Sequence, residues 1–222
     1  MDILLIGAPG AGKGTQAEKL SQLLALRHIA SGDLFYKAFE DQTELGLKAR
    51  SYVDLGELVP DEITIPMVMR RIEEPESAQG VVLEGFPRTL AQAQALDEEL
   101  RRLNRQIDLA IHLKVSREEL LQRLSGRYFC QANQHVYHAK FHPPQVTDRC
   151  DLDGSKLYQR PDDAGEAMRR RLVIYFNQTV QLLDYYSEQN RLREVDGNQS
   201  IDKVQEMLVN EVNDHMRKDT TA

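Results

Sequence analysis

The sequence predicts an α/β protein with a five-stranded parallel sheet covered by helices. Two observations support this fold class. Five short segments are candidate strands, the first of them an apolar run typical of a buried parallel strand, and amphipathic segments with helical spacing lie between them. Strands that alternate with helices form a parallel sheet with right-handed crossovers and helices on both faces. With 222 residues, of which 41% are hydrophobic, the chain can bury such a core in one main domain that carries insertions.

The expected strands are short and end near a glycine or a charged residue. They cover residues 2–7, 28–30, 80–85, 107–115 and 193–197. The expected helices have apolar residues three or four positions apart, and they cover residues 17–24, 62–73, 89–102, 116–124, 166–189 and 201–216. Ser116 is the expected N-cap of its helix, and Glu119, three residues later, completes a capping box.

Two segments do not fit the alternation of strands and helices. Residues 31–60 carry helical patterns but no strand, and residues 127–163 are rich in turn-forming and aromatic residues. We expect both to be insertions into a core formed by residues 1–30, 61–126 and 164–222. Ligands of open parallel sheets bind beyond the carboxyl ends of the strands, so the insertions are expected to form lids there.

Composition excludes several classes of protein. A net charge of −7 argues against a nucleic-acid coat or a membrane-surface protein, and two cysteines are too few for a disulfide scaffold. No apolar run reaches the ~18 residues of a membrane span, and no basic region precedes an apolar one as in a signal peptide. We therefore expect a cytoplasmic protein without nucleic-acid or membrane partners. Since no heptad pattern is present, we expect a monomer.

A glycine-rich loop follows the first expected strand and opens the first helix. Residues 7–15 read Gly-Ala-Pro-Gly-Ala-Gly-Lys-Gly-Thr. Glycines let backbone N–H groups turn inward around phosphate oxygens, the helix N-terminus adds partial positive charge, and Lys13 supplies a full charge. The residue after Lys13 is Gly14 and not Ser or Thr, so we expect Mg²⁺ to be held through water and carboxylates more than by a loop hydroxyl.

This loop resembles that of the adenylate kinases. Residues 31–33 (Ser-Gly-Asp) and 84–88 (Glu-Gly-Phe-Pro-Arg) are similar to the next two motifs of the family. Residues 137–138, 143–144, 159–160 and 162–163 are similar to its lid, and the order and spacing match the long, lidded form up to about residue 201. The resemblance implies a P-loop NTPase-type fold with an NMP-binding and a LID insertion. It also implies the reversible reaction ATP + AMP = 2 ADP with Mg²⁺, in adenine nucleotide homeostasis and salvage.

The resemblance also implies a role for individual residues. Those expected to stabilise the transferred phosphate are Lys13, Arg88, Arg123, Arg160 and Arg171. Those expected to bind ATP are Gly10, Ala11, Gly12, Lys13, Gly14, Thr15, Arg127, Val136, Tyr137 and Gln199. Those expected to bind AMP are Ser31, Tyr36, Glu57, Leu58, Val59, Gly85, Arg88, Gln92, Arg160 and Arg171. Arginine suits this work because it stays charged and grips phosphate with two N–H groups.

Three further expectations concern side chains in and near the insertions. Arg123 and Arg127 lie four residues apart, so one helical face could present both. By resemblance, the carboxamide of Gln92 reads the adenine of AMP. The pair Asp162 and Asp163 is expected to hold the lid closed by pairing with arginines.

The sequence departs from the family pattern at three positions. Ser31 replaces threonine and keeps the hydroxyl, whereas Glu84 replaces aspartate and adds a methylene to a carboxylate expected to orient waters on Mg²⁺. Tyr36 stands where the family has an arginine on the acceptor phosphate, a loss of about 1.5–3 kcal/mol for a charged hydrogen bond. These departures leave open a kinase for UMP, CMP or a deoxynucleotide, GTP as donor, or a nucleotide sensor with weak catalysis.

The two cysteines lie in the second insertion. Cys130-x-x-Asn133 and Cys150-x-x-Asp153 have the spacing of a zinc ribbon in which two cysteines are replaced. By resemblance, some members of the family carry four metal ligands here and others a polar set. We consider a hydrogen-bonded polar cluster the favoured arrangement, ahead of structural Zn²⁺ and a disulfide. His135 and His138 are nearby candidates for a fourth ligand.

Overall fold

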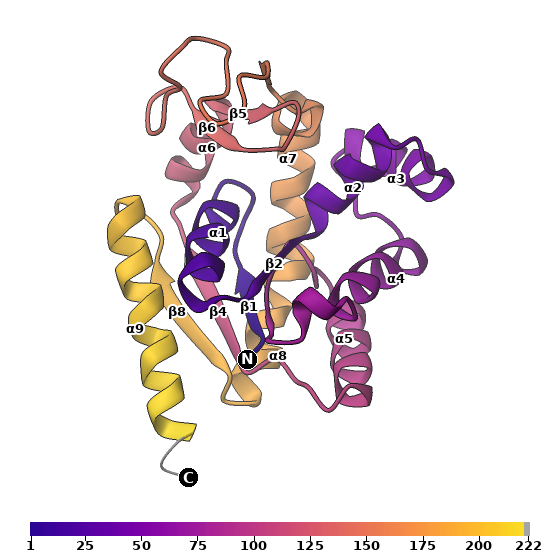
Figure 1. Ribbon diagram of the computed structural model, residues 1–222, viewed down its shortest axis with the longest axis vertical. Helices are drawn as coiled ribbons and strands as arrows, with labels where there is room; N and C mark the ends of the chain where they lie inside the picture. The colour runs from indigo at the N-terminus through magenta and orange to yellow at the C-terminus, as the bar shows by residue number, and fades with distance from the viewer. Residues whose placement is uncertain (220–222) are drawn as a thin grey trace.

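A computed structural model of the chain describes residues 1–219 and shows a five-stranded parallel sheet (Figure 1). Its strands, in spatial order, are β2 (Arg27–Ala30), β3 (Val81–Glu84), β1 (Ile3–Ile6), β4 (Leu109–Lys114) and β8 (Leu192–Asp196). Every expected strand is present within two residues of its expected ends, so the predicted fold class is confirmed.

The central strands form because they are apolar on both sides. All four residues of β1 are buried, and Ile3 pairs with Val82 of β3 and with Leu109 of β4. One apolar core covers each face of the sheet. A strand that is buried on both faces reads as a continuous apolar run, which is the pattern seen in the sequence.

Helices cover both faces of the sheet. The first core is closed by α1 (Lys13–Leu24), α6 (Arg117–Ser125) and α9 (Ile201–Asp219). The second is closed by α4 (Asp61–Ile72), α5 (Leu90–Arg102) and α8 (Gln181–Glu188), with the short turn η1 (Pro75–Ser77) ahead of β3. Among the described residues, no helix is both long enough and apolar enough to cross a membrane.

The two segments that break the alternation have small cores of their own. Residues 31–60, here called the helical insertion, contain α2 (Ser31–Glu40) and α3 (Glu44–Asp54). Residues 127–163, here called the lid segment, contain an antiparallel sheet of β6 (Val136–His138), β5 (Arg127–Cys130) and β7 (Leu157–Tyr158), and end in the turn η2 (Pro161–Asp163). In Figure 1 the lid segment lies at the top, above α1, and α2 and α3 lie at the upper right. The five-stranded sheet and the helices that cover it come from the other described residues, and 220–222 lie outside the described part.

Three details differ from the sequence-based expectations. The strands of the lid segment were not predicted, because they lie among turn-forming and polar residues and lack a continuous apolar run such as that of β1. The expected helix over residues 166–189 is α7 (Gly165–Ile174) and α8, joined by a π-helical turn, η3 (Tyr175–Thr179).

The third difference concerns the start of α6. Ser116 Oγ accepts from the Glu119 N–H at 3.4 Å, as an N-cap should. The reciprocal half of the predicted capping box is absent, because the carboxylate of Glu119 pairs with Arg123. The Ser116 N–H instead donates to Asn198 Oδ1, so a distant loop completes the cap.

Candidate active site

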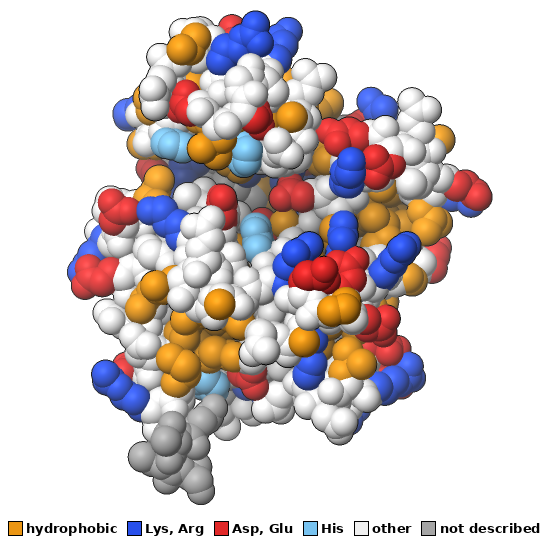
Figure 2. Space-filling model, in the orientation of Figure 1, with side chains coloured by type: hydrophobic (Ala, Val, Ile, Leu, Met, Phe, Trp, Pro, Cys, Tyr) orange, Lys and Arg blue, Asp and Glu red, His pale blue; other side chains and the backbone are white. Residues whose placement is uncertain are grey.

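A cavity of about 840 Å³ lies between the lid segment and the ends of β1, β2, β3 and β8. Figure 2 shows the molecule hollowed there, below the uppermost part of its surface. The volume is in the range of about 300–1,000 Å³ that is typical of ligand pockets. All ten residues expected to bind ATP line this cavity, namely Gly10, Ala11, Gly12, Lys13, Gly14, Thr15, Arg127, Val136, Tyr137 and Gln199.

A second, much smaller cavity adjoins it beside the helical insertion. Its volume is about 60 Å³, well below that of a nucleotide site. All ten residues expected to bind AMP line it, namely Ser31, Tyr36, Glu57, Leu58, Val59, Gly85, Arg88, Gln92, Arg160 and Arg171. Arg88 and Arg171 border both cavities. The two predicted groups therefore line adjoining cavities, and the cavity beside the helical insertion is the smaller one.

The glycine loop has the backbone geometry of an anion site. Gly10 and Gly12 have φ values of 85° and 91°, a region that side chains other than glycine rarely adopt. Gly12 is the N-cap of α1 and gives it no side-chain cap, so the first N–H groups of the helix face the cavity without a side-chain acceptor. Lys13 Nζ donates to the carbonyls of Gly7 and Ala8 at 2.8 and 3.0 Å.

The surroundings of Lys13 disfavour the charged form of its side chain. Burial, and the nearby charges of Arg88, Arg127 and Arg171, lower the pKa of Lys13 from 10.5 to about 7, although Glu84 opposes the shift. Burial is the largest cause of the shift, and the three arginines add to it. A polyphosphate would supply negative charge that opposes it.

We expect ATP binding at about pH 8 to take up close to one proton. A polyphosphate beside Lys13 restores its usual pKa, and an ammonium with a pKa of about 7 is mostly neutral at that pH before binding. Calorimetric titrations in buffers of different ionisation enthalpy would measure the uptake. Lys13→Ala should remove it. A binding enthalpy that is equal in all buffers for the unmodified protein would contradict the expectation.

Glu84, the carboxylate expected to orient waters on Mg²⁺, lines the large cavity. Its Oε1 is 3.7 Å from His28 Nε2, and a Cβ placed on Gly14 would lie 3.0 Å from the same oxygen. Burial by itself would raise the pKa of Glu84, but His28 and Lys13 outweigh it, so the pKa is lowered and the carboxylate stays charged. The longer side chain therefore projects over the start of α1, where position 14 has no side chain.

Four of the five predicted catalytic side chains are arginines that face this cleft. Arg88 Nε donates to the carbonyl of Gly85 at 2.7 Å, and burial and Arg171 lower the pKa of Arg88 to about 10. It remains charged at neutral pH. Arg171 pairs with Asp162 and Asp163 at 2.7 and 2.6 Å.

The other predicted arginines also have acidic partners. Arg127 pairs with Asp163, Arg123 with Glu119 at 2.8 Å, and Arg160 with Asp33 at 2.8 Å. Pairing of the Asp162–Asp163 doublet with arginines is thus present, as expected. The expectation that one helical face presents both Arg123 and Arg127 was wrong, because α6 ends at Ser125 and Arg127 begins β5. Both still line the large cavity.

Gln92 is buried, with 2% of its surface exposed, and both ends of its carboxamide are occupied. Its Oε1 accepts from the Arg88 N–H at 2.8 Å, and its Nε2 donates to Asp61 at 2.6 Å. Gln92 lines the small cavity, but an adenine would have to replace one of these two partners to contact its carboxamide.

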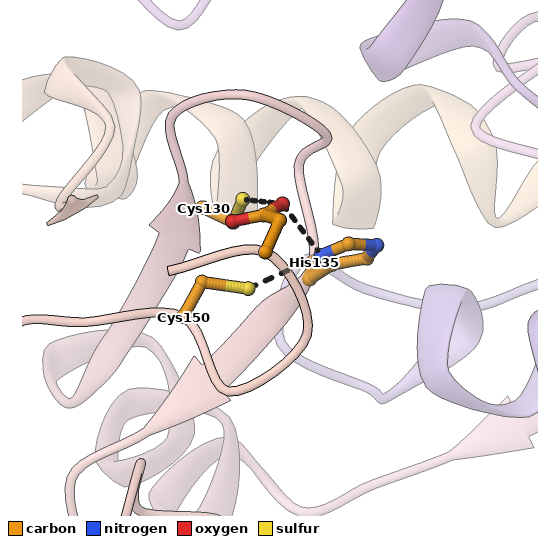
Figure 3. Close-up of side chains that lie close together, drawn as sticks. Cys130, His135 and Cys150 are labelled. Carbon is orange, nitrogen blue, oxygen red and sulfur yellow. Dashed lines mark hydrogen bonds and ion pairs between the residues drawn. The ribbon is translucent and has the colours of Figure 1, made fainter. Parts of the chain in front are cut away.

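The lid segment holds a compact cluster of metal-binding groups (Figure 3). One donor atom from each of Cys130, His135, Cys150 and Asp153 lies within 4.8 Å of the others. Both cysteines are free thiols, so the disulfide alternative is not observed. Asn133 donates to Asp153 at 2.9 Å and is not part of the donor set.

Sequence reasoning missed three residues of the site. His28 pairs with Glu84, and Asp33 with Arg160. The ring of Phe129 lies between two arginines, 5.0 Å from the Arg127 guanidinium carbon and 3.6 Å from that of Arg160. Asp33 belongs to a motif that had been noted, so it could have been found. A phenylalanine two residues after an arginine gives no such signal.

The chain is similar to known proteins over most of its length. The family model described as adenylate kinase matches residues 5–191. An adenylate kinase of Carboxydothermus hydrogenoformans is 50% identical over 204 residues, which cover 92% of this chain and 95% of that protein. Adenylate kinases of Staphylococcus epidermidis and Staphylococcus aureus are each 44% identical over 216 residues, which cover 97% of this chain and 100% of theirs. The chain therefore belongs to the adenylate kinase family.

Proposed function

We propose that the large cavity holds MgATP and that the small one, once opened, holds AMP. The reaction is the reversible phosphoryl transfer ATP + AMP = 2 ADP. The observation that carries the assignment of the two sites is that Arg88 and Arg171 border both cavities. Cations on the shared border can hold two phosphate groups together against their repulsion.

The chemical step needs no general base. An oxygen of the AMP phosphate, already an anion, attacks the γ-phosphorus of ATP while the bond to the β,γ-bridging oxygen breaks, and ADP leaves. Lys13 and the glycine loop neutralise charge on the donor phosphates, and Arg88 orients the acceptor. Arg123, Arg160 and Arg171 complete the ring of positive charge.

Mg²⁺ bound with ATP would neutralise further charge on the phosphates. Glu84 fits the role of holding its water ligands, because its carboxylate is ionised and lines the donor cavity beside Gly14. Thr15 also lines this cavity and offers a hydroxyl. Lys13 Nζ donates to two carbonyls of the loop, and phosphate oxygens would take the place of these acceptors.

We propose that the helical insertion and the lid segment move relative to the core. The acceptor cavity of about 60 Å³ requires opening before AMP can enter. Arg160 pairs with Asp33 across the two insertions, and Arg170 of α7 pairs with Glu57 at 2.8 Å. Closure of such lids excludes water, so the phosphate passes to AMP and not to solvent.

The acceptor and the donor can be tested by initial rates. We expect AMP with ATP to give the highest rate, and UMP, CMP and GTP-driven reactions to be at least about tenfold slower. A faster reaction with UMP or CMP would reassign the acceptor site. Nucleotide binding without turnover on any acceptor would identify a sensor and overturn the proposed function.

The four donor groups in the lid segment fit a zinc ion better than the sequence spacing of the cysteines indicated. Two sulfurs, one imidazole and one carboxylate are a suitable tetrahedral set, and His135 takes the place that Asn133 cannot fill. We propose that Cys130, His135, Cys150 and Asp153 hold one structural Zn²⁺ that ties the loops of the lid segment together.

We expect about one zinc per chain, bound with the four donors above. His135→Ala should abolish stoichiometric zinc and lower the temperature of lid unfolding, because it removes one of four ligands. His138→Ala is the matched control, since His138 contacts Gln122 and its ring packs at a tilt against that of Phe141, outside the donor set. Purified protein that contains no zinc and does not bind it when supplied would show that the cluster is held by hydrogen bonds.

We further propose that the protein acts as a cytoplasmic monomer on free nucleotides. Both cavities are formed by one chain, so a second copy is not needed to complete the site. Both cysteines are reduced, and the net charge of −7 disfavours nucleic-acid partners. Sedimentation at working concentration would measure the mass, and a stable dimer would contradict the proposal.

A further inference from the structure

Tyr36 makes two contacts that tie the helical insertion to the lid segment. Its ring lies under the guanidinium of Arg160, with 4.0 Å between the guanidinium carbon and the ring centroid. Its hydroxyl donates to Asp162 Oδ1 at 2.8 Å. Both partners lie more than 120 residues away in the sequence and line the acceptor cavity.

Arg160 is held from both sides. The ring centroid of Phe129, in β5, lies 3.6 Å from the guanidinium carbon of Arg160. The cation therefore stacks on two rings, Tyr36 of the helical insertion and Phe129 of the lid segment. Stacking uses the face of a guanidinium and leaves its N–H edge available for hydrogen bonds. That edge contacts Asp33 and Gln134, both at 2.8 Å, and Arg160 is only 7% exposed.

Asp162 is held in a similar way. Its Oδ1 accepts from Tyr36 and its Oδ2 pairs with Arg171 at 2.7 Å. Burial and the neighbouring Asp162 carboxylate raise the pKa of Tyr36, so its hydroxyl remains a donor. Without that donor, Asp162 would lose its link to the helical insertion.

We propose that Tyr36 is a positioning residue for acceptor binding, which fixes Arg160 with its ring and Asp162 with its hydroxyl at the acceptor cavity. The inference rests on the proposed function, since it assigns AMP to this cavity. Tyr36 supplies no charge. It makes the charge of Arg160 more effective by restricting where the guanidinium can lie.

The first test separates the ring from the hydroxyl. Tyr36→Leu should raise the KM for AMP by about tenfold, because a desolvated cation–π contact is lost, and should leave the KM for MgATP within about twofold. Tyr36→Phe keeps the ring and should recover most of the affinity. Lys37→Ala, on the same helix but exposed and paired with Asp41, is the matched control and should behave as the unmodified protein.

The second test is a double-mutant cycle on AMP affinity, measured by calorimetry. If Tyr36 acts through Arg160, Tyr36→Leu should cost much less in an Arg160→Met background than in the unmodified protein. Independent, multiplying losses would overturn the proposal. So would equal losses of AMP and MgATP affinity, which would indicate general damage to the fold.

The same measurements distinguish failure of the inference from failure of the proposed function. If the unmodified protein binds no AMP, the proposed acceptor site is wrong and the inference falls with it. If the unmodified protein binds AMP and Tyr36→Leu binds it equally well, only the role given to Tyr36 is overturned.

Discussion

Lys13→Ala is expected to lower kcat by about a hundredfold or more while leaving the fold intact. The ammonium is held at the glycine loop beside Glu84, where phosphate charge develops during transfer, and a preorganised donor of this kind contributes about 10²–10³ in rate. The lowered pKa of Lys13 shows that its charge is not favoured by folding. We therefore expect the unfolding temperature to be retained.

Initial rates at saturating ATP and AMP, with thermal unfolding of the same samples, would measure both effects. Lys19→Ala is the matched control, because Lys19 lies on the same helix and pairs with Asp202 at the surface. Its rate should be nearly unchanged. If Lys13→Ala also turned over at a near-normal rate, the glycine loop would not be the site of phosphoryl transfer.

Arg88→Ala is expected to reduce turnover by a similar factor, through the acceptor. Arg88 borders both cavities and is fixed by Gly85, by Gln92 and by Thr179, whose hydroxyl donates to its carbonyl at 2.9 Å. Removing it takes a charged, oriented contact from the phosphate that must attack. We expect kcat/KM for AMP to fall by about a hundredfold or more, with little change in MgATP binding.

Arg88→Lys separates charge from geometry. A lysine keeps the charge but cannot grip phosphate with two N–H groups, so we expect partial recovery, well below the original rate. Arg102→Ala is the control. Arg102 is the last residue of α5, the helix that follows Arg88, and it forms exposed ion pairs with Glu98 and Glu99. Normal AMP kinetics in Arg88→Ala would remove Arg88 from the acceptor site.

The parts of the fold that were predicted correctly are those with a local signal. The apolar run of β1 and the helical spacing of α1 are properties of neighbouring residues, and the glycine loop between them is written in nine consecutive positions. The strands of the lid segment lie among turn-forming and polar residues and have no apolar run such as that of β1, so no local pattern reveals them. Ser116 is the N-cap of α6, as predicted, but its own N–H donates to Asn198, 82 residues away, and not to Glu119 as local reasoning expected.

The candidate site shows the same division. The motifs, together with the family resemblance, named residues that all line two adjoining cavities. They did not reveal the partners that hold those residues, such as Asp33 for Arg160 or His28 for Glu84. A partner is set by where two distant segments meet, and no spacing within either segment encodes that.

The α/β class, the order of the core strands and helices, the phosphate loop and the family can be read from the amino-acid sequence. These follow from hydrophobic period, glycine placement and motif order, which act over a few residues or are read in one direction along the chain. Three further features are visible in the folded structure alone: Tyr36 contacts Asp162 across 126 residues, His135 completes the donor set, and the cavity beside the helical insertion is small. The reason is physical: these contacts depend on how the helical insertion and the lid segment pack over the sheet, and that packing brings together residues that no local pattern links.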